Sequence, residues 1–360
     1  MKKSLLWVVV VLLSMSMIAV FSLAGCKGEE AAAKEEVVAE EVVESEETIT
    51  TTEAPEQKGY EDISIWFDTG GPEGCSFGTV VYNGAKAAEK DLGCKVTYLF
   101  SDWDAQTMIE NFKLALAAEP DGICIMGHPG EEAYGPLIDE AIEKGIIVTS
   151  QNTDLPSIQE KYVGNGFGYV GQDLYGSGLT LGKTAVSKWD LQPGDKALVW
   201  GWLSQGTRGL RTKGCIDSLE EAGLIVDYIE VSKEGQADLS LDVPSVAAWF
   251  SANPDAKVML ADGGGNTVLV QNIMNAAKKE PGEVKVAGFD LSAATADAIK
   301  SGYVGFVLDQ QPFLQGYLPI LQVCLTKKYN FVGLNIDTGG GIVDETNIDL
   351  LSELAAEGIR

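Results

Sequence analysis

Residues 284–312 read VKVAGFDLSAATADAIKSGYVGFVLDQQP. An apolar run stops at Asp290, a helical pattern follows with Ser292 placed as its N-cap, and a second apolar run from Val304 to Leu308 leads to Gln310. The pattern predicts a strand, a helix and a second strand. In an open parallel sheet, ligands bind just beyond the carboxyl ends of the strands, so Asp290 and Gln310 are candidate ligand-binding residues. The alternative is that Asp290 caps the helix and Gln310 begins a turn.

The same alternation of apolar runs and helical patterns continues on the N-terminal side of this unit. Further strands are expected at 63–67, 96–100, 123–126, 146–149, 197–200, 225–231 and 258–261, and helices at 77–92, 109–116, 137–142, 173–188, 207–222, 244–252 and 267–278. Two successive series of this kind predict an α/β fold with two doubly wound, Rossmann-like parallel-sheet lobes.

Residues 1–26 have the pattern of a targeting segment. Lys2 and Lys3 precede an apolar stretch over 5–20, and the segment ends in Leu-Ala-Gly followed by Cys26. This ending resembles a bacterial lipobox, in which the cysteine thiol is lipidated and becomes the mature N-terminus. We therefore expect a lipoprotein signal peptide and lipidation at Cys26. The alternatives are an ordinary signal peptide and a short membrane helix.

Residues 27–59 contain eleven Glu and three Lys, with a threonine run and Pro55 towards the end. Such a segment cannot bury a core, so we expect an acidic disordered linker between the anchor and the folded body.

The chain carries a net charge of −27, and removing the +2 of residues 1–26 and the −8 of residues 27–59 leaves −21 on residues 60–360. A body this acidic argues against nucleic acid and anionic lipid as partners. Five cysteines follow Cys26 with no zinc-type spacing, and an odd number leaves at least one unpaired. We expect no metal site and buried free thiols at Cys75, Cys94, Cys124, Cys215 and Cys324.

Polar and aromatic residues follow most of the predicted strands, and this is where a ligand would lie. Carboxylates, amides and guanidinium groups match the paired donors and acceptors of neighbouring hydroxyls, and aromatic faces cover the C–H side of a sugar ring. The set therefore suits a polar, uncharged, hydroxyl-rich ligand. It includes Asp68, His128, Asn152, Asp154, Trp202, Asp290 and Gln310, with Arg208 and Arg211 opening the helix after Trp202.

Several short motifs follow one another in a characteristic order over most of the body. They are Gly84-Ala85 with Ala88, Leu92 and Gly93; Gly171, Asp173 and Gly176; Arg211 with Gly214; Gly288-Phe289-Asp290 with Ala298, Ile299, Gln310 and Pro312; and Thr338, Gly339, Val343, Asn347 and Asp349. In their order and spacing the chain resembles the type I periplasmic binding proteins for sugars, the group that contains ribose- and galactose-binding proteins.

This resemblance implies two lobes joined by a three-segment hinge, with sugar bound between them. It implies an N-terminal lobe of 60–171 plus 311–338 and a C-terminal lobe of 172–310 plus 339–360. The expected protein is exported, lipid-anchored to the cell envelope and monomeric. It would deliver a simple sugar to the permease of an ABC importer, without a cofactor and without enzymatic activity.

Carried over position by position, Arg211, Asp290 and Gln310 match sugar-contacting residues of the ribose-binding type, and Phe77 resembles its stacking aromatic. Three positions depart from the family pattern. Asn152 stands where Asp is usual, His128 where Asn is usual, and Gly263 where another Asn is usual. Each departure changes the hydrogen-bonding pattern that faces a hydroxyl, so the identity of the sugar is open. Trp202 is a candidate stacking platform, with a core position as its alternative.

Other functions fit the same residues less well. Gly166, Gly168 and Gly171 match a Gly-x-Gly-x-x-Gly string, but no apolar strand precedes them and no acidic strand end follows at the required distance. His128 is the only histidine and no Gly-x-Ser-x-Gly elbow exists, so catalysis is not expected. The export signal excludes a transcription factor of the related lactose-repressor type. A nucleoside-binding lipoprotein of the same fold and a receptor that signals to a membrane sensor remain open.

Overall fold

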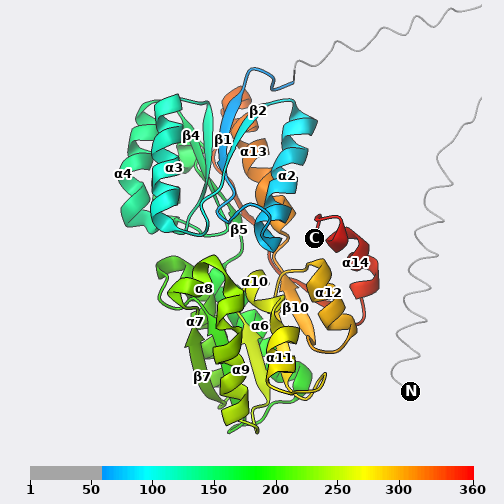
Figure 1. The fold of residues 1–360 in the computed structure, drawn as a ribbon. Coiled ribbons are helices and arrows are strands. Elements are labelled where there is room, and N and C mark those ends of the chain that lie inside the picture. The colour runs from blue at the N-terminus through cyan, green and yellow to red at the C-terminus, as the bar shows by residue number, and fades with distance from the viewer. Residues whose placement is uncertain (1–58) are drawn as a thin grey trace, which may run out of the picture. The chain divides into compact units, whose positions relative to one another are not determined.

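The computed structural model describes residues 59–360, so the predicted signal peptide, the lipidation site Cys26 and linker residues 27–58 lie outside the described residues. Within 59–360 the chain forms two six-stranded sheets flanked by helices (Figure 1). The predicted α/β fold with two parallel-dominated sheets is confirmed. None of the helices in this part of the chain is long and apolar enough to span a membrane.

The first sheet has the strand order β11-β5-β4-β3-β1-β2, and every neighbouring pair is parallel. Its strands are β1 (Ser64–Asp68), β2 (Lys95–Leu99), β3 (Gly122–Met126), β4 (Ile147–Gln151), β5 (Gly168–Gly171) and β11 (Asn335–Asp337). The helices of this part are α2 (Ser76–Leu92), α3 (Ala105–Ala118), α4 (Gly130–Glu143), α5 (Pro156–Tyr162) and α13 (Pro312–Tyr329), with the 3-10 turn η1 (Val163–Asn165).

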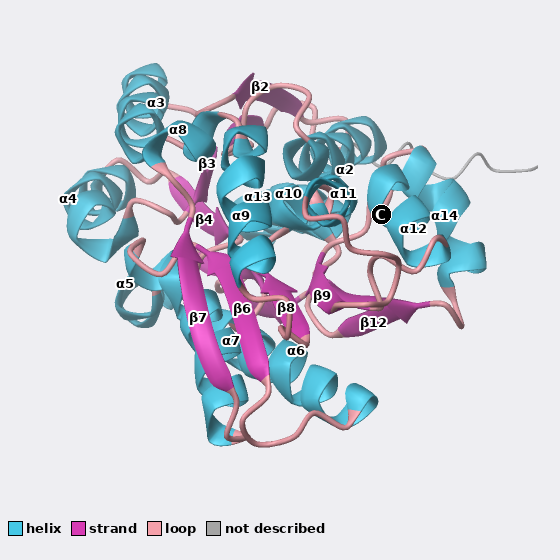
Figure 2. Ribbon diagram, turned by 60° about the horizontal axis from the view of Figure 1, so that its bottom comes forward, coloured by secondary structure: helices cyan, strands magenta, loops and turns pink. Residues whose placement is uncertain are grey.

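The second sheet has the order β12-β10-β9-β8-β6-β7, with β12 antiparallel to β10 and the other pairs parallel. Figure 2 labels β7, β6, β8, β9 and β12 of this sheet. Its strands are β6 (Lys196–Gly201), β7 (Ile225–Glu230), β8 (Val258–Ala261), β9 (Lys285–Phe289), β10 (Phe306–Asp309) and β12 (Gly341–Asp344). The helices are α6 (Leu174–Trp189), α7 (Gly209–Glu221), α8 (Lys233–Ala237), α9 (Val243–Ala252), α10 (Gly264–Thr267), α11 (Val270–Ala276), α12 (Ala293–Lys300) and α14 (Ile348–Ala356), with 3-10 turns η2 (Gly206–Arg208) and η3 (Leu239–Asp242).

Alternate residues of each central strand enter opposite faces of its sheet, as the two-residue repeat of a strand requires. In β6, Leu198 and Trp200 belong to one buried apolar cluster, and Ala197 and Val199 belong to another. Both faces are therefore packed, which is why the strands read as nearly continuous apolar runs.

The predicted strand–helix–strand unit is β9, α12 and β10, near the middle of the second sheet. Ser292 caps α12 as expected, because its Oγ accepts a hydrogen bond of 3.1 Å from the backbone N–H of Thr295. The alternative in which Asp290 caps this helix is therefore wrong. The helix expected over 267–278 is interrupted, and α10 and α11 are separated by Val268 and Leu269.

The chain passes between the sheets three times: from β5 to α6, from β10 to α13, and from β11 to β12. The crossing segments are bonded to one another, since Thr338 N–H donates to Gly171 O over 3.0 Å and Gln311 Nε2 donates to Thr338 O over 2.8 Å. The three-segment hinge is thus present. Sheet membership supports the predicted lobe boundaries near 171, 310 and 338, and the full assignment of residues to lobes stays a prediction.

The glycine string at 166–171 does not form a phosphate loop. Gly166 follows the turn η1 with φ of 90°, and β5 begins at Gly168, inside the string. A dinucleotide-binding motif would instead have a strand before the glycines and a helix opening within them. The five cysteines in the described part of the chain are free thiols, four of them buried and Cys75 half-buried.

Candidate functional site

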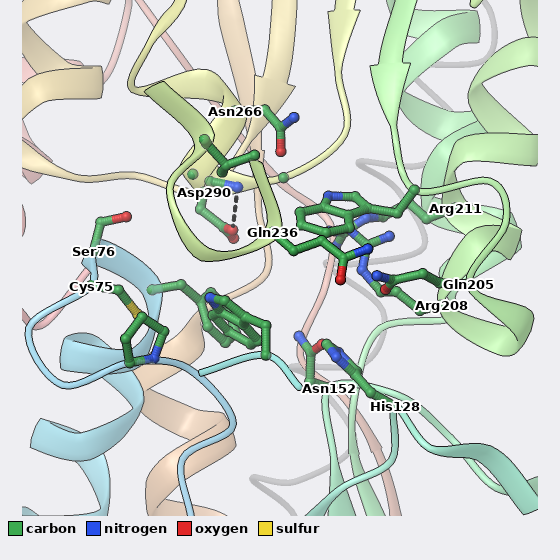
Figure 3. Close-up of a pocket in the computed structure, with 18 of the residues that line it drawn as sticks. Cys75, Ser76, His128, Asn152, Gln205, Arg208, Arg211, Gln236, Asn266 and Asp290 are labelled. Atoms are coloured by element: carbon green, nitrogen blue, oxygen red, sulfur yellow. Dashed lines mark hydrogen bonds between the residues drawn. The ribbon is translucent and has the colours of Figure 1, made fainter. Parts of the chain in front are cut away.

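A cavity of about 220 Å³ lies at the carboxyl ends of the strands and is lined from both sheets and from a crossing segment (Figure 3). The residues before Gly171 supply aromatic rings, an imidazole and an amide. Those after it supply the charged side chains together with Trp202 and further amides, and Gln310 comes from the second crossing. The side chains that matter below are Phe77, Trp103, His128, Asn152, Trp202, Gln205, Arg208, Arg211, Asn266, Asp290 and Gln310.

Aromatic rings form one wall of the cavity. Trp103 is stacked on the imidazole of His128 with the ring centroids 5.7 Å apart, and it packs at a tilt against Phe77 at 5.9 Å. Trp202, from the other sheet, is also on the cavity and is mostly buried. Such rings can cover the apolar C–H surface of a ring-shaped ligand from two sides.

A buried ion cluster organises the opposite wall. Arg211 Nε lies 2.6 Å from Asp262 Oδ1, and Arg208 Nη1 lies 3.1 Å from Asp262 Oδ2. Burial alone would raise the pKa of Asp262, but Arg208 and Arg211 lower it, so the carboxylate stays charged. The Thr212 hydroxyl also donates to this carboxylate. Asp262 therefore holds both guanidinium groups in fixed positions beside the cavity.

Arg208 and Arg211 have further contacts that fix their planes. Arg208 Nη2 donates to the backbone oxygen of Asp262 over 2.8 Å, and the Arg211 guanidinium lies 4.2 Å from the ring centre of Phe289. Burial, followed by the neighbouring charge of Arg211, lowers the pKa of Arg208. A rigid, planar fork of donors is suited to paired oxygen acceptors on a ligand.

Asp290 has one carboxylate oxygen bonded and one unbonded. Oδ2 accepts from Gly264 N–H at 3.1 Å and from Gln310 Nε2 at 2.9 Å, whereas Oδ1 is buried without a partner. Burial raises the pKa of Asp290 to about 6, and the charge of Arg211 opposes that rise. A buried unbonded acceptor is costly, so Oδ1 is a position where a ligand hydroxyl would be stabilising.

Asn152 and Asp290 occupy corresponding places in the two sheets, one residue beyond β4 and β9. Both have left-handed backbone conformations, with φ of 63° and 65°. Trp103 and Gln311, also at this edge, have positive φ as well. Non-glycine residues in the left-handed conformation cost energy and cluster at functional sites. The backbone conformations and the side chains therefore indicate the same location for the candidate site.

Most of the predicted site residues lie on this one cavity: Phe77, His128, Asn152, Trp202, Arg208, Arg211, Asp290 and Gln310. The structure does not place Asp68 and Asp154 there. Asp68 is occupied inside the first lobe, where it accepts from Gly70 N–H at 2.8 Å, from Asn111 and from the Ser101 hydroxyl. Asp154 lies two residues beyond Asn152, and it does not line the cavity.

Other residues also line the cavity. Trp103, Gln205 and Arg208 follow predicted strands, so the strand-end rule includes them as it does Arg211. Asn266 is different, because it lies in the short helix α10 and its buried Nδ2 has no partner. The Gln236–Leu239 segment also reaches the cavity, with no signal in its sequence.

Among residues 59–360, no group of three or more His, Cys, Asp and Glu side chains could hold a metal ion. The polar groups on the cavity instead suit hydrogen bonding to an organic ligand. Two parallel-dominated sheets, three crossings and a polar cavity lined from both sheets define a type I solute-binding protein.

Residues 65–324 match the model of a family described as "Periplasmic binding protein domain". The match covers most of the chain, so this chain belongs to the periplasmic binding protein family.

Individual relatives agree with this assignment. The xylose/arabinose-binding protein XylF of Sulfolobus acidocaldarius is 29% identical over 272 residues, which are 71% of this chain and 65% of that relative's length, slightly less than two thirds. A carbohydrate transporter from Acidothermus cellulolyticus in complex with myo-inositol has a similar fold, with a TM-score of 0.71 at 23% identity, covering 83% of this chain and 99% of that one. A solute-binding protein from Burkholderia graminis in complex with D-arabinose gives 0.71 at 22% identity, covering 81% and 98%.

Proposed function

We propose that this protein is an exported solute-binding protein that captures a simple sugar in the cavity between its lobes and delivers it to an ABC importer. The observation that carries the proposal is the composition of the cavity: aromatic rings from both lobes, fixed guanidinium groups, and the unbonded Asp290 Oδ1. These are the groups that a ring with several hydroxyls needs.

The charge balance of the cavity supports a neutral ligand. Arg208 and Arg211 are matched by Asp262 and ionised Asp290, and the remaining lining carboxylate, Asp238, is exposed. A charged ligand would leave an excess charge in a mostly buried space, which is costly. The names of the relatives fit this argument, because they include xylose, arabinose and myo-inositol as ligands.

A thermal-shift screen tests the proposal. Purified residues 59–360 are heated with D-xylose, L-arabinose, D-arabinose, D-glucose, D-galactose, myo-inositol and a set of nucleosides. A ligand at one hundred times its dissociation constant adds about 2.7 kcal/mol to the free energy of unfolding, which gives a clear rise in melting temperature. Stabilisation by nucleosides and by none of the sugars would support the nucleoside-binding alternative.

The partner on the membrane is a separate question, since an importer and a membrane sensor would receive the same sugar-bound protein. The proposal of an importer is tested by uptake of the bound sugar in cells with and without the gene for this protein. Loss of uptake is expected; unchanged uptake with a lost transcriptional or motility response would favour the sensor. We also propose that the folded protein is a monomer and performs no chemistry on its ligand.

The proposed anchor is tested at Cys26, which lies outside the described residues. The Cys26→Ser protein should be released from membranes or left unprocessed, because serine lacks the thiol that is lipidated. Residues 59–360 should fold and bind sugar as before. Membrane association equal to wild type, with the same mature N-terminus, would contradict the lipid anchor.

A further inference from the structure

The hydrogen bonds of Gln310 have a fixed direction. Its Nε2 is 2.9 Å from Asp290 Oδ2, and an ionised carboxylate can only accept. The amide nitrogen of Gln310 must therefore face Asp290, which turns its Oε1 towards the first lobe. There, Oε1 lies 3.2 Å from Asn152 Nδ2.

This direction sets the orientation of Asn152. Its Nδ2 donates to Gln310 Oε1 and to Gln315 Oε1, both at 3.2 Å, and all three side chains are buried. The Oδ1 of Asn152 is then on the opposite side, 3.0 Å from Nε2 of His128. Because Oδ1 is an acceptor, His128 Nε2 must carry the hydrogen.

The second nitrogen of His128 is left as an acceptor. Burial lowers the pKa of His128 to about 4, and the charges of Arg208 and Arg211 act in the same direction, so the ring is neutral at pH 7. A neutral imidazole with a hydrogen on Nε2 has a lone pair on Nδ1. His128 lines the cavity, and no residue in 59–360 is hydrogen-bonded to Nδ1. Stacking on Trp103 fixes the plane of the ring.

We propose that His128 is a specificity-determining residue that presents one hydrogen-bond acceptor, Nδ1, to the cavity and so selects a ligand with a hydroxyl that donates at that point. The donor–acceptor direction at His128 is set by a series of linked hydrogen bonds. They run from Asp290 through Gln310 and Asn152 to His128 and connect the two lobes. This inference rests on the proposed capture of a sugar and deepens it by assigning a donor–acceptor direction to one contact.

The tautomer can be measured directly, because His128 is the only histidine in the chain. In a ¹⁵N-histidine-labelled sample of residues 59–360 without ligand at pH 7, long-range ¹H–¹⁵N spectra distinguish a protonated ring nitrogen from an unprotonated one. We expect the unprotonated signal at Nδ1 and the protonated signal at Nε2. The opposite assignment, or an equal mixture, would overturn the proposal.

A second experiment tests recognition. The sugars of the thermal-shift panel and their monodeoxy derivatives are titrated calorimetrically against wild type, His128→Phe and His128→Gln. Phenylalanine keeps a ring to stack on Trp103 without any acceptor, whereas the glutamine amide can donate to Asn152 and still present an acceptor. Wild type should bind one monodeoxy derivative about tenfold more weakly than its parent, the effect of losing one hydrogen bond.

His128→Phe should bind the parent sugar about tenfold more weakly and lose discrimination at that hydroxyl only, while His128→Gln should retain part of it. A His128→Phe protein that discriminates as wild type does would overturn the role of His128. Equal melting temperatures of the ligand-free variants would separate recognition from folding. If no sugar bound wild type, the proposed function would fail, and the ligand-free nitrogen assignment would report separately on the hydrogen-bond direction.

Discussion

At the scale of single residues, the unbonded oxygen of Asp290 leads to a prediction about affinity. Asp290→Asn keeps the shape of the side chain. Its oxygen can still accept from Gly264 and Gln310, which would put its NH₂, a donor, in the place of the unbonded Oδ1. Calorimetry with the sugar found in the screen should show binding at least about tenfold weaker, since a hydrogen bond to a charged group contributes roughly 1.5–3 kcal/mol.

The stability of the ligand-free protein should not fall in the same variant, because the substitution removes a carboxylate whose pKa is raised by burial. Asp297→Asn, an exposed carboxylate on the neighbouring helix α12, is the matched control and should bind as wild type does. Normal affinity in Asp290→Asn would place the ligand elsewhere.

The pKa of Asp290, about 6, also predicts a pH dependence of binding. Oδ2 already accepts two N–H groups, so a proton would go to Oδ1 and turn the unbonded acceptor into a donor. Ligand affinity should therefore fall as the pH drops through 6, by about tenfold at one unit below the pKa if only the ionised form binds. The Asp290→Asn protein should lack this step in titrations between pH 7.5 and 5.

The stability of the ligand-free protein should change in the opposite sense. The pKa of Asp290 is higher in the folded chain than its ordinary value of 3.8, so the folded state binds the proton more tightly than the unfolded state. The contribution of this group should stabilise the fold as the pH falls from above 6 towards 3.8. Denaturant titrations of wild type and Asp290→Asn over this range isolate that contribution.

The sequence predicts most of the residues that line the cavity because strand ends converge at one edge of a parallel sheet. It could not separate Asp290 from Asp68, since each aspartate stands at the end of an apolar run. The difference comes from residues distant in sequence from each aspartate. Ser101 and Asn111 donate hydrogen bonds to Asp68, whereas Asp290 keeps one oxygen without a partner. Only the folded structure brings those partners together.

At the scale of secondary-structure elements, β9, α12 and β10 could be predicted because their periodicity and the Ser292 cap agree. Strand β5 was missed because two of its four residues are glycine and its neighbours β4 and β11 hold it in place. Helix α13 was not predicted either. Pro312 suits its first position, but the helix has no side-chain N-cap and contains Pro319, which a helical pattern normally excludes.

The contact between α2 and α13 gives a prediction about packing. A Cβ atom built on Gly84 would lie 1.9 Å from the backbone oxygen of Phe313. This oxygen is part of the main chain of α13, so the clash can be relieved only if α13 shifts. Gly84→Ala should therefore lower the free energy of unfolding by about 1–3 kcal/mol, measured by urea titration.

Gly135→Ala is the matched control for this substitution. Gly135 lies inside helix α4, and apart from its chain neighbours a Cβ there would meet nothing within 4 Å. The better helix propensity of alanine is opposed by contact of its Cβ with the ring of Pro136, so this variant should change the free energy of unfolding by less than about 1 kcal/mol. A Gly84→Ala protein as stable as Gly135→Ala would show that the two helices can separate at little cost.

At the scale of the whole molecule, the three crossing segments predict closure on ligand binding. Groups from both lobes line one cavity, so a ligand that contacts both should favour the closed arrangement. Small-angle scattering of residues 59–360 should give a smaller radius of gyration with the bound sugar than without it. A non-binding sugar at the same concentration is the control, and an unchanged radius would contradict hinge closure.

The ion cluster around Asp262 has a consequence for the rates of capture and release. Arg208, Arg211, Asp262 and Asp290 all come from the second lobe and are held by bonds within it or at the crossing, so this half of the site is preassembled. An incoming molecule can dock there first, and the aromatic wall at Phe77 then closes behind it. Substitutions in that wall should shorten the residence time and leave the association rate constant nearly unchanged.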